Sequence, residues 1–153
     1  MWTKKASLYA SLVITVIIFI AIVTSPVYLP RLLANFVRPF GFDGRENAAF
    51  SSLLTVLFAS TLPGLLCDLT LFALLMNIRA ERVFVARNVT YLRVLSWCCF
   101  LVGAEYLLFS FRYQFLSLFF IAFAALFVGM ILRVIKNVFD QAIALREEND
   151  YTI

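Results

Sequence analysis

Two carboxylate residues, Asp68 and Glu105, lie inside stretches of sequence that are otherwise apolar. Asp68 stands in GLLCDLTLF, which begins at Gly64, and Glu105 stands in LVGAEYLLF, which begins at Leu101. An ionisable side chain near the centre of a bilayer costs at least about 2.5–3.5 kcal/mol on insertion scales, so it is a functional candidate by default. On antiparallel helices the two acids fall within a turn or two of the same depth, which makes a coupled pair geometrically feasible.

Several roles are open for such acids. A buried carboxyl group without a partner stays neutral and donates a hydrogen bond to a neighbouring helix. Alternatively, a pair beside a polar cavity binds a cation, an amine or a peptide, or carries protons during transport. Catalysis is not expected, because the G-x-G-D pattern of intramembrane aspartyl proteases is missing and the sequence contains no histidine to act as a base.

The helix face that carries Asp68 is small and polar. Thr61, Gly64 and Asp68 recur at spacings of three and four residues, which places them on one stripe. A glycine in such a stripe lets a neighbouring backbone approach closely. Pro63 beside the stripe frees the carbonyl group of Ala59, and we expect the two hydroxyl side chains that follow Ala59 to compensate.

Glu105 shares a helix face with Arg112, which lies two turns, or about 10 Å, further along the axis. We expect both acids to face the interior between the two apolar segments that carry them, since a carboxyl group facing lipid would lack hydrogen-bond partners. The residues of this predicted polar intramembrane site are Asp68, Glu105, Thr61, Tyr106 and Arg112.

Small or polar residues also recur at helix-packing spacing in the last two apolar segments. Membrane helices approach closely where such residues line up. The stripes are formed by Cys99, Gly103, Tyr106 and Ser110 in one segment and by Ala122, Ala125 and Gly129 in the next.

The composition is that of a membrane protein. Of the 153 residues, 63% are hydrophobic and 14% are charged, and the mean hydropathy is +0.95. Soluble domains average about 45–50% apolar and about 25% charged residues. The net charge of +4 comes from basic residues scattered beside apolar segments, so it does not predict nucleic-acid binding.

Four segments are long and apolar enough to span a bilayer, at about 20 residues each. They cover residues of about 6–29, 50–76, 92–111 and 115–135, and leave an outer loop (30–49), an inner loop (77–91) and a tail (136–153). We expect the first segment to remain as an uncleaved helix, because it is too long for a signal peptide and lacks an A-x-A site. The predicted fold is therefore all-α: a single membrane domain with four antiparallel transmembrane helices in a bundle.

The distribution of basic residues predicts the orientation. With both termini in the cytoplasm, nine Lys and Arg residues flank the inner ends of the spans and four flank the outer ends, in keeping with the positive-inside rule. The inner set is Lys4, Lys5, Arg79, Arg82, Arg87, Arg93, Arg133, Lys136 and Arg146, and the outer set is Arg31, Arg38, Arg45 and Arg112.

The two loops and the tail also carry helical patterns. Leu32, Leu33, Phe36 and Val37 recur at helical spacing and predict a short helix on the outer membrane surface, or a cap that binds a ligand. The tail has an apolar helical stripe and an i,i+4 pair, Lys136 and Asp140. We therefore expect the last helix to continue into the cytoplasm. The predicted docking residues for a partner are Val138, Phe139, Ala142, Arg82 and Arg87.

Metal and cofactor sites are not expected. The three cysteines, Cys67, Cys98 and Cys99, all lie in apolar segments without a C-x-x-C spacing. With no histidine available, zinc and haem sites lose their usual ligands. We interpret the cysteines as small buried hydrophobic residues.

The chain resembles a family of small bacterial membrane proteins of unknown function with four predicted spans. The resemblance rests on CDLTLF (67–72), WCCFLVGAEYLLF (97–109) and the closing IKNVFDQAIALREENDYTI (135–153). It implies the four-span topology and carries no catalytic residues. Genes of this family often stand beside a small helix-turn-helix regulator, which implies that the protein is the membrane partner in a regulatory pair.

These observations favour a non-enzymatic sensor or regulatory partner that docks a cytoplasmic protein through its tail and inner loop. Two alternatives stay open: a small transporter or channel that uses the intramembrane carboxylates, and an immunity-type protein that protects against membrane-active peptides. The bilayer is the predicted environment, and assembly into oligomers is open.

Overall fold

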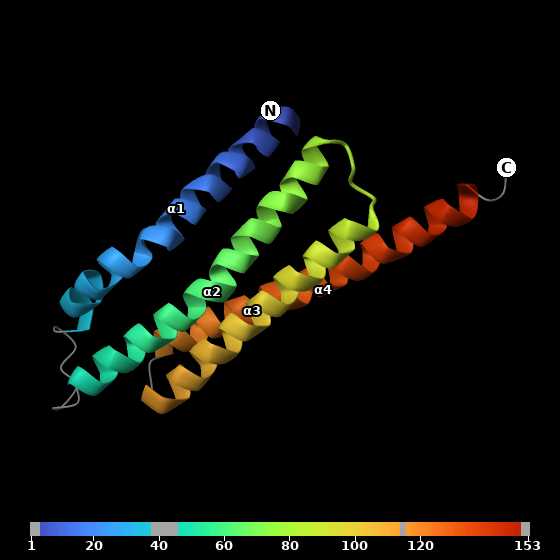
Figure 1. The fold of residues 1–153 in the computed structure, drawn as a ribbon. Coiled ribbons are helices and arrows are strands. Elements are labelled where there is room, and N and C mark those ends of the chain that lie inside the picture. Colours follow the sequence, from blue (N-terminus) through green and yellow to red (C-terminus); the bar gives the residue numbers. More distant parts are fainter. Residues whose placement is uncertain (1–3, 38–45, 114–115, 151–153) are drawn as a thin grey trace.

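The computed structural model describes residues 4–37, 46–113 and 116–150, and these form four long helices. They are α1 (Lys4–Val37), α2 (Glu46–Arg79), α3 (Ala86–Tyr113) and α4 (Leu116–Asp150). Successive helices run in opposite directions, and the start of the first helix lies at the same end of the molecule as the end of the last (Figure 1). The predicted all-α fold is confirmed. Each helix contains a stretch long and apolar enough to cross a membrane.

The helices pack in the order of the sequence. Among the described residues, extensive contacts join α1 to α2, α2 to α3 and α3 to α4, and the α3–α4 pair is the most closely packed. Helix α1 therefore lies at one edge of the assembly (Figure 1). Its apolar side chains, such as Val13, Ile17 and Val27, are more than half exposed, as expected for a surface that contacts lipid.

Helix α1 continues to Val37 although it contains Pro26 and Pro30. The predicted separate helix on the outer surface is therefore wrong, because residues 30–37 belong to the same helix as the first span. Proline removes one backbone donor and leaves the carbonyl four residues earlier without its partner. At Pro26 this carbonyl belongs to Ile22, and the Ser25 hydroxyl donates a 2.7 Å hydrogen bond to it.

Helices α2 and α3 are longer than the predicted spans, so the inner connection shrinks to residues 80–85. Glu81, the second residue after α2, adopts a positive φ of 60°. The Glu81 amide donates to the carbonyl oxygen of Ile78, and the Arg82 amide donates to that of Asn77. This pair of hydrogen bonds is the Schellman arrangement, in which glycine usually holds the left-handed position.

The predicted extension of the last helix is confirmed. Helix α4 is continuous over 35 residues, or about 52 Å at 1.5 Å per residue. A bilayer core is about 30 Å thick, so roughly 20 Å of α4 extends beyond it. The predicted pair is present, with Lys136 Nζ 3.8 Å from Asp140 Oδ2. Because the Asp140 side chain is 60% exposed, this pair contributes little stability.

Small residues allow the close approach of α3 and α4. A Cβ atom added to Gly103 would lie 2.7 Å from Leu126 Cγ and 3.2 Å from the carbonyl oxygen of Ala122. One added to Gly129 would lie 3.2 Å from the Cβ atom of Cys99. The predicted small-residue stripes therefore face each other at this contact.

Candidate functional site

Glu105 of α3 is tied to α2 by a hydrogen bond. The Ser60 hydroxyl lies 3.0 Å from Glu105 Oε2 and 2.7 Å from the backbone carbonyl oxygen of Val56. A hydroxyl carries one hydrogen and two lone pairs, so Ser60 is shared between its own helix and the carboxyl group of α3. Tyr106 lies beside this pair, and its phenol interacts with the Ser60 hydroxyl. Glu105 thus faces the interior between α2 and α3, as expected.

Asp68 occupies a different environment. Its side chain is buried, with 6% exposed, and it lines a cavity of about 170 Å³ between α1 and α2. The other lining residues are Thr15, Val16 and Phe19 of α1 and Leu69 and Phe72 of α2. Within the described part of the chain, the Asp68 carboxylate makes no hydrogen bond and no ion pair.

The structure does not bring the two acids together in one cavity. Asp68 lies eight residues beyond Ser60 on α2, or about 12 Å along the axis, and Glu105 is not among the residues that line the Asp68 cavity. The expectation that Asp68 faces the space between α2 and α3 is wrong, because the stripe that carries it turns toward α1. Thr61 and Gly64 of the same stripe line a second cavity with Ile22 of α1.

The remaining predicted site residues are spread along the molecule. The Thr61 hydroxyl donates to the carbonyl of Leu57, and Tyr106 lines the same second cavity, of about 280 Å³. Arg112 is exposed near the end of α3.

The hydroxyl groups of Ser60 and Thr61 donate to the carbonyl oxygens of Val56 and Leu57 rather than to that of Ala59. The predicted compensation for Pro63 is therefore wrong, because each hydroxyl reaches back four residues along its own helix.

Two asparagines that were not predicted as site residues hold together the end of the molecule that carries the loop between α2 and α3. Asn88 is fully buried. Its side-chain amide donates to the carbonyl oxygens of Arg82 at 2.9 Å and Val83 at 2.7 Å, and its Oδ1 accepts a 2.7 Å hydrogen bond from Asn77 Nδ2. The sequence contained an indication of this role, because one asparagine stands near each end of the predicted inner loop. The backbone groups of such a loop need hydrogen-bond partners.

Two cysteines from different helices also meet. Cys67 of α2 and Cys99 of α3 are free thiols whose side chains interact. The sequence placed each in an apolar segment but gave no indication that the two segments would align them. In the described residues, no group of three or more potential ligand side chains is arranged to hold a metal ion.

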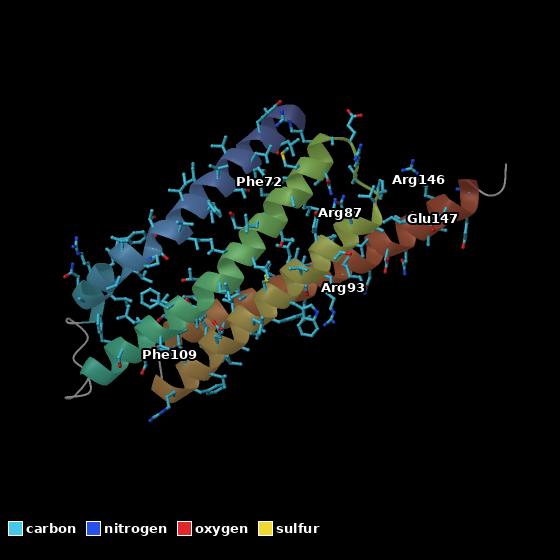
Figure 2. All side chains as sticks on the ribbon, in the orientation of Figure 1. Phe72, Arg87, Arg93, Phe109, Arg146 and Glu147 are labelled. Atoms are coloured by element: carbon cyan, nitrogen blue, oxygen red, sulfur yellow. The ribbon has the colours of Figure 1, made fainter. Side chains whose placement is uncertain are left out.

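The predicted docking residues gather at the end of the molecule that carries the loop between α2 and α3. The Phe84 ring of the loop packs on Phe139 of α4, with ring centroids 5.6 Å apart. Val138 is 58% exposed, Ala142 is partly covered, and Arg82 and Arg87 are exposed. Figure 2 shows Arg87 near the start of α3 and Arg146 on the α4 extension, at the same end of the molecule.

Four apolar helices with buried polar contacts between them define a multi-pass α-helical membrane protein. A family model described as "Protein of unknown function (DUF2975)" matches residues 3–153, and the chain belongs to this family. This confirms the resemblance seen in the sequence. No curated protein and no solved structure matches the chain.

Proposed function

We propose that the protein is a non-enzymatic membrane sensor or regulatory partner that binds a cytoplasmic protein through the inner loop and the α4 extension. The observation that carries this proposal is the ordered inner loop. Asn88 fixes the loop backbone, and the contact between Phe84 and Phe139 seats the loop against α4. A loop held in this way presents its side chains in a defined arrangement, which lowers the entropic cost of binding.

The charge of this surface defines the partner's chemistry. Arg82, Arg87 and Arg146 are exposed around it, beside the exposed apolar side chain of Val138. The complementary partner carries acidic residues around an apolar patch, since electrostatic complementarity steers association. The family resemblance supports a helix-turn-helix regulator as this partner. The proposal places both termini in the cytoplasm.

Co-purification tests the proposal. The protein is isolated from native membranes in mild detergent, with a candidate helix-turn-helix regulator carrying a different tag. We expect the regulator to co-purify, and we expect Arg82→Glu with Arg87→Glu to reduce its recovery at least about tenfold. Arg31→Glu, which reverses a charge near the opposite end, serves as the matched control. If the Arg82→Glu, Arg87→Glu variant and the Arg31→Glu control recovered equal amounts of the regulator, this docking surface would be refuted.

A second candidate function is a small transporter, and the cavity at Asp68 favours it. A buried carboxylate that lines a cavity inside a membrane segment is typical of ion and proton pathways. Proton or amine flux into liposomes that contain the purified protein would support this function if Asp68→Asn abolished the flux. Equal flux in protein-free liposomes would count against it.

A further inference from the structure

The cavity at Asp68 has an unusual combination of burial, charge and access. Asp68 is 6% exposed and Thr15 is 3% exposed, yet both line the cavity. Among the described residues, every side-chain oxygen or nitrogen atom that is completely buried has a hydrogen-bond partner. An oxygen atom without such a partner must therefore be exposed to open space. The Asp68 carboxylate makes no hydrogen bond to any other described residue, so its oxygen atoms are open to the cavity rather than sealed in protein.

The remaining lining is apolar and aromatic. Phe19 of α1 and Phe72 of α2 flank the polar residues, and Figure 2 shows Phe72 between these two helices. Val16 is 46% exposed and Leu69 is 53% exposed. Because these rim residues belong to apolar membrane-spanning helices, the cavity opens sideways toward lipid rather than toward water.

The cavity continues along the α1–α2 contact. A third cavity, which is apolar and has a volume of about 350 Å³, shares Val16 and Phe72 with the Asp68 cavity and extends to Tyr9 and Arg79. The Arg79 guanidinium group lies 5.4 Å from the centre of the Tyr9 ring and marks the inner end of the groove. A molecule that enters from the membrane thus finds a carboxylate at the deep end and an apolar channel beside it.

The chemistry of the lining selects the ligand. A calcium ion needs six to eight oxygen ligands, whereas the described residues that line this cavity supply one carboxylate and one hydroxyl. An anion would be repelled by Asp68. A lipophilic ammonium group fits: its N–H groups donate to the carboxylate, and its positive charge is attracted to aromatic faces. The Thr15 hydroxyl donates to the carbonyl of Ser11 at 2.9 Å, which leaves its oxygen free to accept.

We propose that the cavity formed by Thr15, Phe19, Asp68 and Phe72 is a binding site for lipophilic amines that enter from the membrane. The ammonium group binds Asp68 and Thr15, and the apolar body lies against Phe19 and Phe72. The volume of about 170 Å³ is close to that of engineered cavities of about 150 Å³ that hold benzene. It therefore accepts a single ring or a short alkyl chain. This inference does not depend on the proposed cytoplasmic partner.

The test uses benzylamine and its neutral analogue benzyl alcohol with the full-length protein in lipid nanodiscs. Binding is measured by ligand-observed NMR titration. We expect saturable binding of the amine, binding of the alcohol at least about tenfold weaker, and loss of this preference in Asp68→Asn. Glu105→Gln, which alters the other intramembrane carboxylate, should leave the affinity within about twofold.

Two further variants keep the test decisive if Asp68→Asn fails to fold, which thermal unfolding would reveal. Thr15→Val removes the second acceptor, and Thr24→Val is its matched control at an exposed position on the same helix. Phe19→Leu removes an aromatic face while keeping an apolar side chain. Both Thr15→Val and Phe19→Leu should weaken amine binding several-fold, and by more than they weaken binding of the alcohol. Equal affinity for amine and alcohol in the unmodified protein, or no effect of any cavity variant, would overturn the proposal.

Discussion

Asn77 Nδ2 donates a 2.7 Å hydrogen bond to Asn88 Oδ1 and so joins the last turn of α2 to the first turn of α3. Asn88 uses its amide group for two loop carbonyls at the same time. A fully buried side chain whose hydrogen-bonding groups are satisfied in this way orders the loop that it touches. The proposed docking surface depends on this order.

Replacing Asn88 should therefore destabilise the inner end. Asn88→Ala leaves two carbonyl groups and the Asn77 amide without these partners, and unsatisfied buried groups cost about 1–3 kcal/mol. We expect a lower melting temperature in detergent and faster hydrogen exchange at residues 80–85. Thr90→Val is the control, because the Thr90 hydroxyl is exposed and makes only a 3.5 Å contact with its own helix. An unchanged exchange rate in Asn88→Ala would contradict the role assigned to this residue.

Glu81→Gly should stabilise the protein. Glu81 holds a positive φ of 60°, a conformation that costs an L-residue about 1–2 kcal/mol and glycine almost nothing. We expect the free energy of unfolding to rise by about 1 kcal/mol, since the greater entropy of glycine in the unfolded chain offsets part of the gain. Glu81→Ala removes the same charge but keeps the unfavourable conformation, so it should give no increase. Equal stabilisation by Glu81→Gly and Glu81→Ala would show that the gain comes from removing the negative charge rather than from relieving the backbone conformation.

Gly103→Ala should weaken the α3–α4 contact. The added Cβ would lie 2.7 Å from Leu126 Cγ and close to the carbonyl of Ala122, and overpacking of this kind typically costs about 1–3 kcal/mol. Adding Leu126→Ala to the Gly103→Ala variant should restore part of the lost stability. Gly64→Ala is the matched control, because its nearest neighbour is Ile22 Cδ1 at 3.9 Å. Thermal unfolding of the three variants and the parent protein provides the measurement, and a Gly103→Ala protein as stable as the parent would contradict the close packing.

The bond between Ser60 and Glu105 should be measurable as a coupling between α2 and α3. A double-mutant cycle with Ser60→Ala and Glu105→Leu is expected to give about 0.6 kcal/mol, the average for interhelical hydrogen bonds in membranes. Glu105→Gln should be milder than Glu105→Leu, because the amide keeps an oxygen acceptor and adds a donor. A coupling energy of zero would show that the two side chains act independently.

The proposed orientation predicts opposite labelling of the two sides. A membrane-impermeant maleimide should react with Asn47→Cys in intact cells and with Asn149→Cys only after lysis. The parent protein, with its three native cysteines in apolar segments, measures the background. If Asn149→Cys reacts in intact cells, the C-terminal end is outside and docking of a cytoplasmic protein at this end is excluded.

The sequence alone determined the number of spans and the extension of α4. Bilayer thickness sets the length of a spanning helix, and the lack of water in the bilayer requires each span to satisfy its own backbone. The Lys136–Asp140 pair was equally predictable, because residues four apart on a helix are neighbours whatever surrounds them. The grouping of Thr61, Gly64 and Asp68 on one stripe followed from the same periodicity.

The tertiary structure alone decided which neighbour each stripe meets. Periodicity assigns Asp68 and Glu105 to helix faces, but helices that are apolar on every side do not distinguish a lipid-facing surface from a protein-facing one. Packing turned Asp68 toward Thr15 on α1 and Glu105 toward Ser60 on α2. The pairing of Asn77 with Asn88 likewise depended on the path of the loop between them, because two polar side chains become partners only when the backbone brings them within hydrogen-bonding distance.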